Sequence, residues 1–216
     1  MEAEEQRQRI LRAASRVLAE HGFDGVRLRD IAKAAGVSIG MLQHHFETRE
    51  QLLKQAAVWG SDDILRRWGG LAQGEPDPWK RFVGLIEDRS GGPDLRRECI
   101  TWTELCASAS RHSDLRPTVR GVYDGWRDLV TGVVEEGTRR GLFHPVMPAA
   151  DVVDLLLVTV DGCEMAIAAG VAAVDGERFR TIVLSAARLA LGLPRQQSAD
   201  QPGAPGTGGG LTRPSR

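Results

Sequence analysis

Gly36, Ser38 and Gly40 are spaced as Gly-x-Ser-x-Gly within the segment AGVSIGMLQHHF. This spacing is that of the nucleophile elbow of serine hydrolases, in which a serine on a sharp turn attacks an acyl carbon. The elbow requires a buried strand that runs into the turn, because only then does the serine stand exposed above a sheet. The elements that precede Gly36 therefore decide whether this serine can act as a nucleophile.

The residues before Gly36 predict helices and not a strand. Apolar residues over 6–20 and over 28–35 recur every three or four positions, which is the spacing of an amphipathic helix. Gly22 follows the first segment, and Gly36 ends the second where a left-handed residue is favoured. Ser38 can cap a third, short helix that contains Met41 and Leu42. Because a helix leads into Gly36, the elbow interpretation is excluded.

Two short helices joined by a glycine turn are typical of a helix-turn-helix, whose second helix lies in the major groove of DNA. Ala32 allows the helices to approach closely, Gly36 reverses the chain, and Val37 with Leu42 fills the angle between them. Residues 6–54 carry nine basic and five acidic side chains, whereas the whole chain has a formal net charge of -1. A mixed, solvated helix surface would have a similar composition, so charge alone does not decide.

Residues 9–53, RILRAASRVLAEHGFDGVRLRDIAKAAGVSIGMLQHHFETREQLL, resemble the TetR family of transcriptional repressors. The landmarks of the family stand here as Gly22-Phe23 and residues 29–32, 35–38, 40, 42, 44–46, 48–50 and 52–53. Thr48 and Gln51 have the spacing of a capping box, which predicts that a fourth helix begins there. The resemblance covers about a quarter of the chain and implies an all-α fold that binds double-stranded DNA.

The resemblance implies DNA-binding roles for individual residues. Ser38 would cap the recognition helix and present its amide or hydroxyl to a phosphate, and Ile39, Gly40 and Gln43 would face the base edges. Where the family usually has tyrosine, Gln43 can pair with adenine, whereas Ile39 can only contact a thymine methyl or a sugar. The residues expected at the DNA backbone are Arg27, Lys33, His45, Thr48 and Arg49.

Beyond residue 54 the sequence predicts further helices and no strand. Their expected starts are at Asp77-Pro78, Pro93-Asp94, Pro117, Pro148 and Asp175. We therefore expect about nine helices, with a DNA-binding domain over 1–47 and a helical effector-binding and dimerisation domain over 48–193. The Pro/Gly-rich composition of 194–216 predicts a disordered tail.

The last two predicted helices are apolar on more than one face and rich in small residues, which favours burial against a partner subunit. The central helix of a monomer would have the same pattern, so both remain open. The resemblance implies a homodimer formed by these two helices. Such a dimer would place two recognition helices about 34 Å apart and read a palindromic operator.

The resemblance also implies a cavity among the middle helices for an unknown small-molecule effector that releases the repressor from DNA. Glu104, Asp161 and Glu164 are acids within apolar helices, and an acid there could select a cationic or hydroxylated ligand. A core aromatic or a solvated acid is commoner at each such position. The expected lining residues are Trp102, Cys106, Tyr123, Trp126, Asp161, Glu164 and Met165.

The sequence contains no pattern that predicts catalysis, a metal site or a cofactor. His112 and His144 stand in no catalytic motif, so we expect no enzyme. Cys99 and Cys106 share a helix face and could sense redox state or a metal, although small buried cysteines are commoner. The alternative to a DNA-binding regulator is an adaptor that binds only proteins through a helix-turn-helix shape. Such an adaptor would make no phosphate contacts.

The composition also bounds the location of the chain. No run of about 18 apolar residues occurs, and the charged N-terminal segment lacks the apolar core of a signal peptide. We therefore expect a cytoplasmic protein that does not contact the membrane.

Overall fold

The structure, a computed structural model, describes residues 2–71, 75–171 and 173–194. Within these ranges the chain forms nine α-helices and one short 3-10 helix, and no strand, so the predicted all-α class is confirmed. The helices are α1 (Glu2–Gly25), α2 (Leu28–Ala35), α3 (Ile39–His45), α4 (Arg49–Leu71), α5 (Pro78–Gly91), α6 (Leu95–Arg111), η1 (Ser113–Leu115), α7 (Arg116–Arg139), α8 (Ala149–Ala168) and α9 (Gly176–Ala190). Beyond Pro194, the predicted tail lies outside the described residues.

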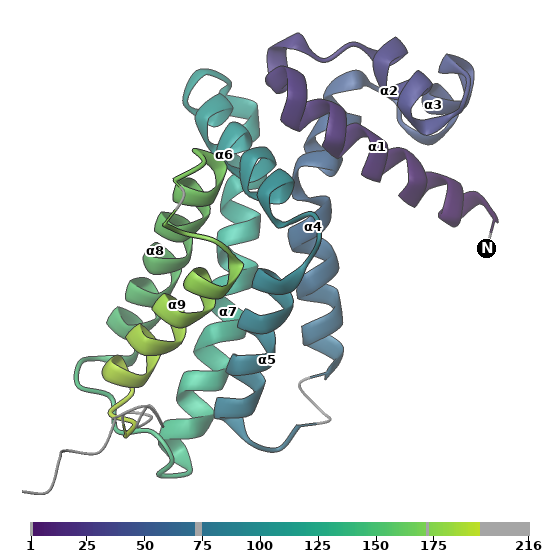
Figure 1. Cartoon of the computed structure of the whole chain (residues 1–216). Coiled ribbons are helices and arrows are strands. Elements are labelled where there is room, and N and C mark those ends of the chain that lie inside the picture. Colours follow the sequence, from purple (N-terminus) through teal and green to yellow (C-terminus); the bar gives the residue numbers. More distant parts are fainter. Residues whose placement is uncertain (1, 72–74, 172, 195–216) are drawn as a thin grey trace, which may run out of the picture.

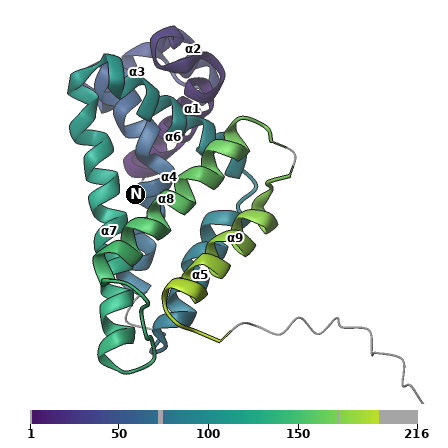
Figure 2. The same cartoon turned by 90° about the vertical axis from the view of Figure 1, so that its left-hand side faces the viewer.

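The helices are arranged as a small head on a longer body (Figure 1). The head contains α1, α2 and α3, and α4 runs from it along the body. Helix α6 packs on α1 of the head and also on α8 of the body. Helices α8 and α9 pack against each other and face the viewer in Figure 2. Through α4 and α6, the head is therefore connected to the body by two separate helices.

Most of the predicted helix starts are formed by the expected caps. The Ser38 hydroxyl accepts a hydrogen bond from the Met41 amide at 3.1 Å. The Asp77 carboxylate accepts one from the Trp79 amide at 2.9 Å, and Asp175 accepts one from Arg178 at 2.8 Å. These bonds satisfy amide groups that have no partner within the first helical turn.

Three predicted details differ in the structure. Gly22 breaks the helix as expected, in a non-helical conformation (φ 68°, ψ 168°), but a further helical turn follows the break, so α1 ends only at Gly25. Asp94 forms no side-chain cap and instead pairs with Arg97. At the start of α4, Thr48 accepts from the Gln51 amide at 3.0 Å, but the Gln51 side chain accepts from the amide of Glu47 and not of Thr48.

The buried apolar side chains form two clusters. The first contains the core of the head, which continues into α6 and α7 through Leu105, Ala109 and Val122. The second lies among α5 to α9 and surrounds the buried charges of Arg89 and Glu164. Because the core of the head extends into the body, a domain boundary at residue 47 stays a prediction. Among the described residues, no helix is both long and apolar enough to cross a bilayer.

Candidate DNA interface and effector cavity

The turn between α2 and α3 has the geometry of a helix-turn-helix. Gly36 ends α2 in the left-handed region (φ 67°, ψ 37°), and the Val37 amide donates back to the carbonyl of Ala32 at 3.0 Å. This closure of a helix end by a left-handed glycine redirects the chain into α3. The element that enters Gly36 is a helix, so Ser38 caps α3 and has no strand on which to stand as a nucleophile.

The outer face of α3 carries the residues that were predicted to meet base edges. Leu42 is buried in the head, whereas Gly40 and Gln43 are exposed. Ile39 is an aliphatic residue that is nevertheless 45% exposed. The structure thus places Ile39, Gly40 and Gln43 where a ligand outside the head can reach them, and their contact with bases stays a prediction.

The residues predicted at the DNA backbone fall into two groups. Arg27 and Lys33 are exposed at the two ends of α2. His45 and Thr48 already have protein partners, because a ring nitrogen of His45 lies 3.1 Å from Gln6 Oε1 and Thr48 caps α4. Arg27 and Lys33 are therefore the freer candidates for phosphate contact.

Arg49 has a role that the sequence did not predict. Its Nε donates to the carbonyl of Val26 at 3.0 Å, and its Nη2 donates to the carbonyl of Phe23 at 2.7 Å. The guanidinium also lies over the Phe23 ring, 5.9 Å from its centroid. These contacts tie the start of α4 to the segment between α1 and α2. Direct phosphate contact by Arg49 stays a prediction.

Five of the seven predicted effector-binding residues line one small cavity between α6, α7 and α8. They are Trp102, Tyr123, Trp126, Asp161 and Glu164, and Val122 and Leu157 complete the lining. The cavity volume is about 30 Å³. This volume is enough for one or two waters but far below the several hundred Å³ of typical small-molecule sites.

Two aromatic side chains of the lining donate hydrogen bonds to Asp161. The indole Nε1 of Trp102 donates to Asp161 Oδ1 at 3.2 Å, and the Tyr123 hydroxyl donates to Asp161 Oδ2. Burial, followed by this bond, raises the pKa of the Tyr123 hydroxyl well above its ordinary value. Tyr123 therefore stays protonated at neutral pH and acts as a hydrogen-bond donor to the carboxylate.

A buried ion-pair network adjoins the cavity. Arg89 of α5 donates to Glu164 Oε1 through Nε at 2.8 Å and to Glu98 Oε2 through Nη1 at 3.2 Å. Burial raises the pKa of Glu164, and the nearby Arg89 opposes that shift. Glu164 and Glu98 thus share the one guanidinium, and Asp161 on the cavity wall accepts from Trp102 and Tyr123 instead, so the region has more acidic than basic groups.

Three other residues considered for the cavity, namely Glu104, Cys106 and Met165, do not line it. Met165 does not line this cavity, because it is 62% exposed on α8, and its contact with an effector stays a prediction. Cys106 is only near the cavity, and burial followed by Asp161 and Glu164 raises its pKa to about 12. Glu104 faces the head, where Glu104 Oε1 accepts from the Phe23 amide at 3.0 Å.

Sequence reasoning missed Arg89, although a signal was present. Phe82, Ile86 and Arg89 follow one another at helical spacing, so the arginine stands in the buried stripe of α5. A basic residue in such a stripe requires a buried acidic partner. Glu164 in an apolar helix was that partner, but the sequence alone did not connect the two.

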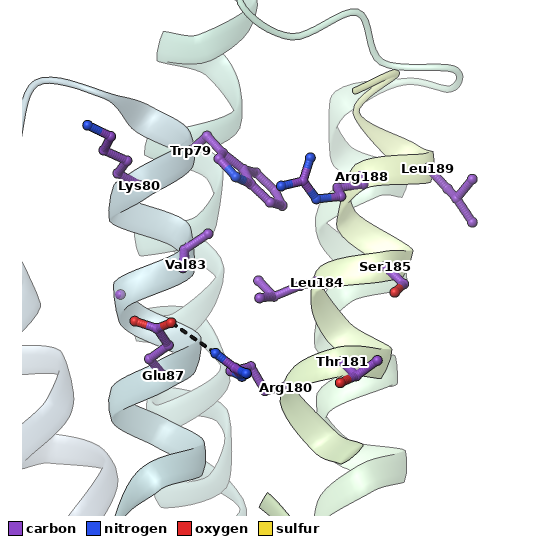
Figure 3. Close-up of a pocket in the computed structure, with 11 residues that line it drawn as sticks. Trp79, Lys80, Val83, Glu87, Arg180, Thr181, Leu184, Ser185, Arg188 and Leu189 are labelled. Carbon is purple, nitrogen blue, oxygen red and sulfur yellow. Dashed lines mark hydrogen bonds and ion pairs between the residues drawn. The ribbon is translucent and has the colours of Figure 1, made fainter. Parts of the chain in front are cut away.

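A second, wider hollow of about 920 Å³ lies open between α5 and α9 and was not predicted (Figure 3). Trp79, Val83 and Leu184 form its apolar walls. The Arg188 guanidinium lies 4.6 Å from the Trp79 ring centroid, and Arg180 pairs with Glu87 at 3.2 Å. Glu87 is the one acid among its lining residues and is paired with Arg180, so the lining has more basic than acidic groups.

Comparison with known families now identifies the chain. Residues 10–56 match the model of bacterial regulatory proteins of the tetR family, and residues 81–192 match that of the BetI-type transcriptional repressor C-terminal domain. The chain belongs to the TetR family of transcriptional regulators. The resemblance inferred from residues 9–53 is therefore confirmed, and the head is the DNA-binding domain of this family.

Individual proteins are similar to this chain in sequence or in fold. The regulator PksA of Bacillus subtilis is 30% identical over 129 residues, which span 59% of this chain and 63% of PksA. A TetR-family structure from Rhodococcus sp. has a TM-score of 0.75 at 23% identity and covers 87% of this chain and 99% of its own. A protein from Saccharomonospora viridis in complex with choline has a TM-score of 0.72 at 24% identity, with coverages of 84% and 95%. Identities this low establish the common fold alone.

Proposed function

We propose that this TetR-family regulator is a homodimeric repressor that binds a palindromic operator and is released by a cationic small molecule. The observation that carries the proposal is the cavity in which two aromatic donors and two carboxylates converge. The proposal has three parts, namely the dimer, the effector and the coupling between effector and DNA.

The dimer is supported by apolar side chains that the single subunit leaves uncovered. On α8, Leu155, Val158 and Met165 follow at three- and seven-residue spacing and are 41%, 68% and 62% exposed. Leu189 on neighbouring α9 is 57% exposed. An apolar stripe of this kind marks an interface. In a two-fold dimer the stripe would meet its own copy, and α8 and α9 of both subunits would form a four-helix bundle.

The effector class follows from the chemistry of the cavity. Aromatic faces attract cations, and quaternary ammonium groups are commonly bound by several aromatic rings together. Here Trp102, Tyr123 and Trp126 supply the rings, and Asp161 and Glu164 supply the negative charge. The choline complex of the Saccharomonospora viridis neighbour supports the same ligand class.

Because the cavity is small, an effector that enters it has to move the side chains that line it. A ligand such as choline needs more than about 30 Å³, so it must displace Trp102 and Tyr123 from Asp161. This rearrangement moves α6 and α7 relative to α8. An effector that binds more tightly to the open form shifts the dimer away from the form that fits the operator. A coupling of about 1 to 3 kcal/mol would lower operator affinity by several-fold to about a hundredfold.

The effector part is tested by ligand-induced stabilisation. We expect choline chloride to raise the Tm of the full chain above the effect of sodium chloride at equal ionic strength, because a ligand bound only by the folded state stabilises it. Asp161→Asn should abolish this increase, whereas Asp151→Asn, an exposed acid on the same helix, should not. An equal increase in Tm for wild type and Asp161→Asn would refute binding at this cavity.

A further inference from the structure

The last turn of α1 is bound to two other helices through the backbone of one residue, Phe23. We call residues 22–26, which are this last turn and the residue after it, the corner. Because Gly22 leaves the helical conformation, the Phe23 amide is turned out of α1 and donates to Glu104 Oε1 of α6 at 3.0 Å. The Phe23 carbonyl accepts from Arg49 Nη2 of α4 at 2.7 Å. Phe23 thus uses one backbone group for each of the two helices that connect the head to the body.

The side chains of Glu104 and Arg49 are each held by a further hydrogen bond. The Ser108 hydroxyl donates to Glu104 Oε1 at 3.1 Å, one turn further along α6. Arg49 Nε donates to the carbonyl of Val26 at 3.0 Å, so its guanidinium spans the corner. The planar fork of an arginine can serve two carbonyls at once, which a lysine ammonium on a flexible stem cannot reproduce with the same geometry.

Further contacts connect α6 and the segment after it to the same region. The Thr101 hydroxyl lies 3.4 Å from the carbonyl of Ser15, and His112 Nε2 lies 3.1 Å from Asp24 Oδ1. The corner is also packed, because Phe23 and Val26 are almost fully buried. Since Arg27 follows the corner and is the N-cap of α2, the position of the corner sets where α2 and α3 begin.

Helix α6 lies between the corner and the effector cavity. Trp102 and Glu104 are two residues apart, so they point about 200° apart around the helix axis. Trp102 lines the cavity and Glu104 holds the corner. A displacement of α6 on the cavity side therefore acts on the corner through a side chain that is already hydrogen-bonded to it.

We propose that Arg49 and Glu104 are positioning residues for DNA reading, which fix the head on the body by binding the two backbone groups of Phe23. Arg49 acts through the corner and not by contacting a phosphate. Glu104, which is remote in sequence from the helix-turn-helix, contributes to operator affinity. This inference rests on DNA binding by the head and is independent of the identity of the effector.

Salt dependence distinguishes positioning from phosphate contact. A lost phosphate contact lowers the slope of log affinity against log salt by about 0.9, whereas a displaced head lowers affinity with little change of slope. With full-chain protein and operator DNA from a random-pool selection, we expect Arg49→Lys and Arg49→Ala each to weaken binding by about tenfold at unchanged slope. The comparison variant is Lys33→Ala, which removes an exposed candidate for phosphate contact and should reduce the slope.

Glu104 is tested with a matched pair of variants. Glu104→Ala should weaken operator binding by about tenfold, and Glu104→Gln should restore most of that affinity because its amide oxygen still accepts from the Phe23 amide. Hydrogen exchange measured on peptides that cover residues 20–27 should be faster in Glu104→Ala and near wild type in Glu104→Gln. If both residues act through the corner, the double variant Arg49→Lys with Glu104→Ala should lose less than the sum of the two single losses in binding free energy.

Three results would overturn the inference. If Arg49→Lys binds operator DNA like wild type and Arg49→Ala has a shallower slope of log affinity against log salt, Arg49 contacts a phosphate. Glu104→Ala with wild-type affinity and wild-type exchange would remove Glu104 from DNA reading. Additive losses in the double variant would show that the two residues act separately. A wild-type protein that binds no duplex would instead refute DNA reading itself, whatever the variants do.

Discussion

The exposed stripe on α8 makes the proposed dimer testable with a single substitution. Leu155 is 41% exposed in the subunit. Full burial of a leucine side chain contributes about 1.5–3 kcal/mol, so covering the exposed part contributes about 0.6–1.2 kcal/mol. In a two-fold interface each substitution occurs twice. Leu155→Asp should therefore cost the dimer about 1–2.5 kcal/mol in lost apolar burial, and desolvation of two carboxylates adds to that.

The assay is sedimentation velocity over a range of protein concentrations. The loss of apolar burial alone raises the dimer Kd by about fivefold to seventyfold. The matched control is Leu142→Asp, because Leu142 is 43% exposed but lies in the turn after α7 and not on α8 or α9. If Leu155→Asp remains as dimeric as wild type, or if Leu142→Asp dissociates equally, the assignment of the interface to α8 and α9 is wrong.

Three further predictions follow from individual residues. Gly36→Ala places a Cβ in open space but on a left-handed backbone. The free energy of unfolding should therefore fall by about 1–2 kcal/mol, and the Tm by a few degrees. An unchanged Tm would contradict the turn geometry. Gln43→Ala should change which bases are preferred at one position of each half-site in a binding selection, and an unchanged preference would remove Gln43 from base reading. Burial first, and then Asp161 and Glu164, raise the pKa of Cys106 to about 12. Because only the thiolate reacts with iodoacetamide, modification of Cys106 at pH 8.5 should be about a thousandfold slower in the native protein than in urea, as followed by mass spectrometry. Rapid native modification would reopen a redox role for this thiol.

The local elements of this fold were predictable because their causes lie within a few residues. The cap formed by Ser38 and the left-handed end of α2 at Gly36 depend only on neighbours in sequence, and the structure has both. The lining of the cavity between α6, α7 and α8 was also partly predictable, whereas its role in effector binding stays a proposal. Trp102 and Asp161 stand within apolar helices and do line it, although Glu104, chosen by the same pattern, contacts the head instead.

The remaining features depend on how the helices are placed relative to one another. Met165 and Asp161 are four residues apart on α8, yet the small rotation between them puts Met165 on the exposed side. The basic character of Arg49 predicted a phosphate contact, but its position relative to the end of α1 directs it toward the carbonyls of Phe23 and Val26. Glu104 meets Phe23 across 81 positions of sequence, and no local pattern predicts such a contact.

The central claim is that α3 of two subunits reads DNA, and selection from a random duplex pool tests it most directly. We predict that the full chain enriches a palindrome whose half-sites are about one helical turn apart. We also predict that affinity for the enriched sequence falls steeply as salt rises. A pool that stays random after repeated rounds at low ionic strength, or one that enriches a single half-site without symmetry, would contradict the claim.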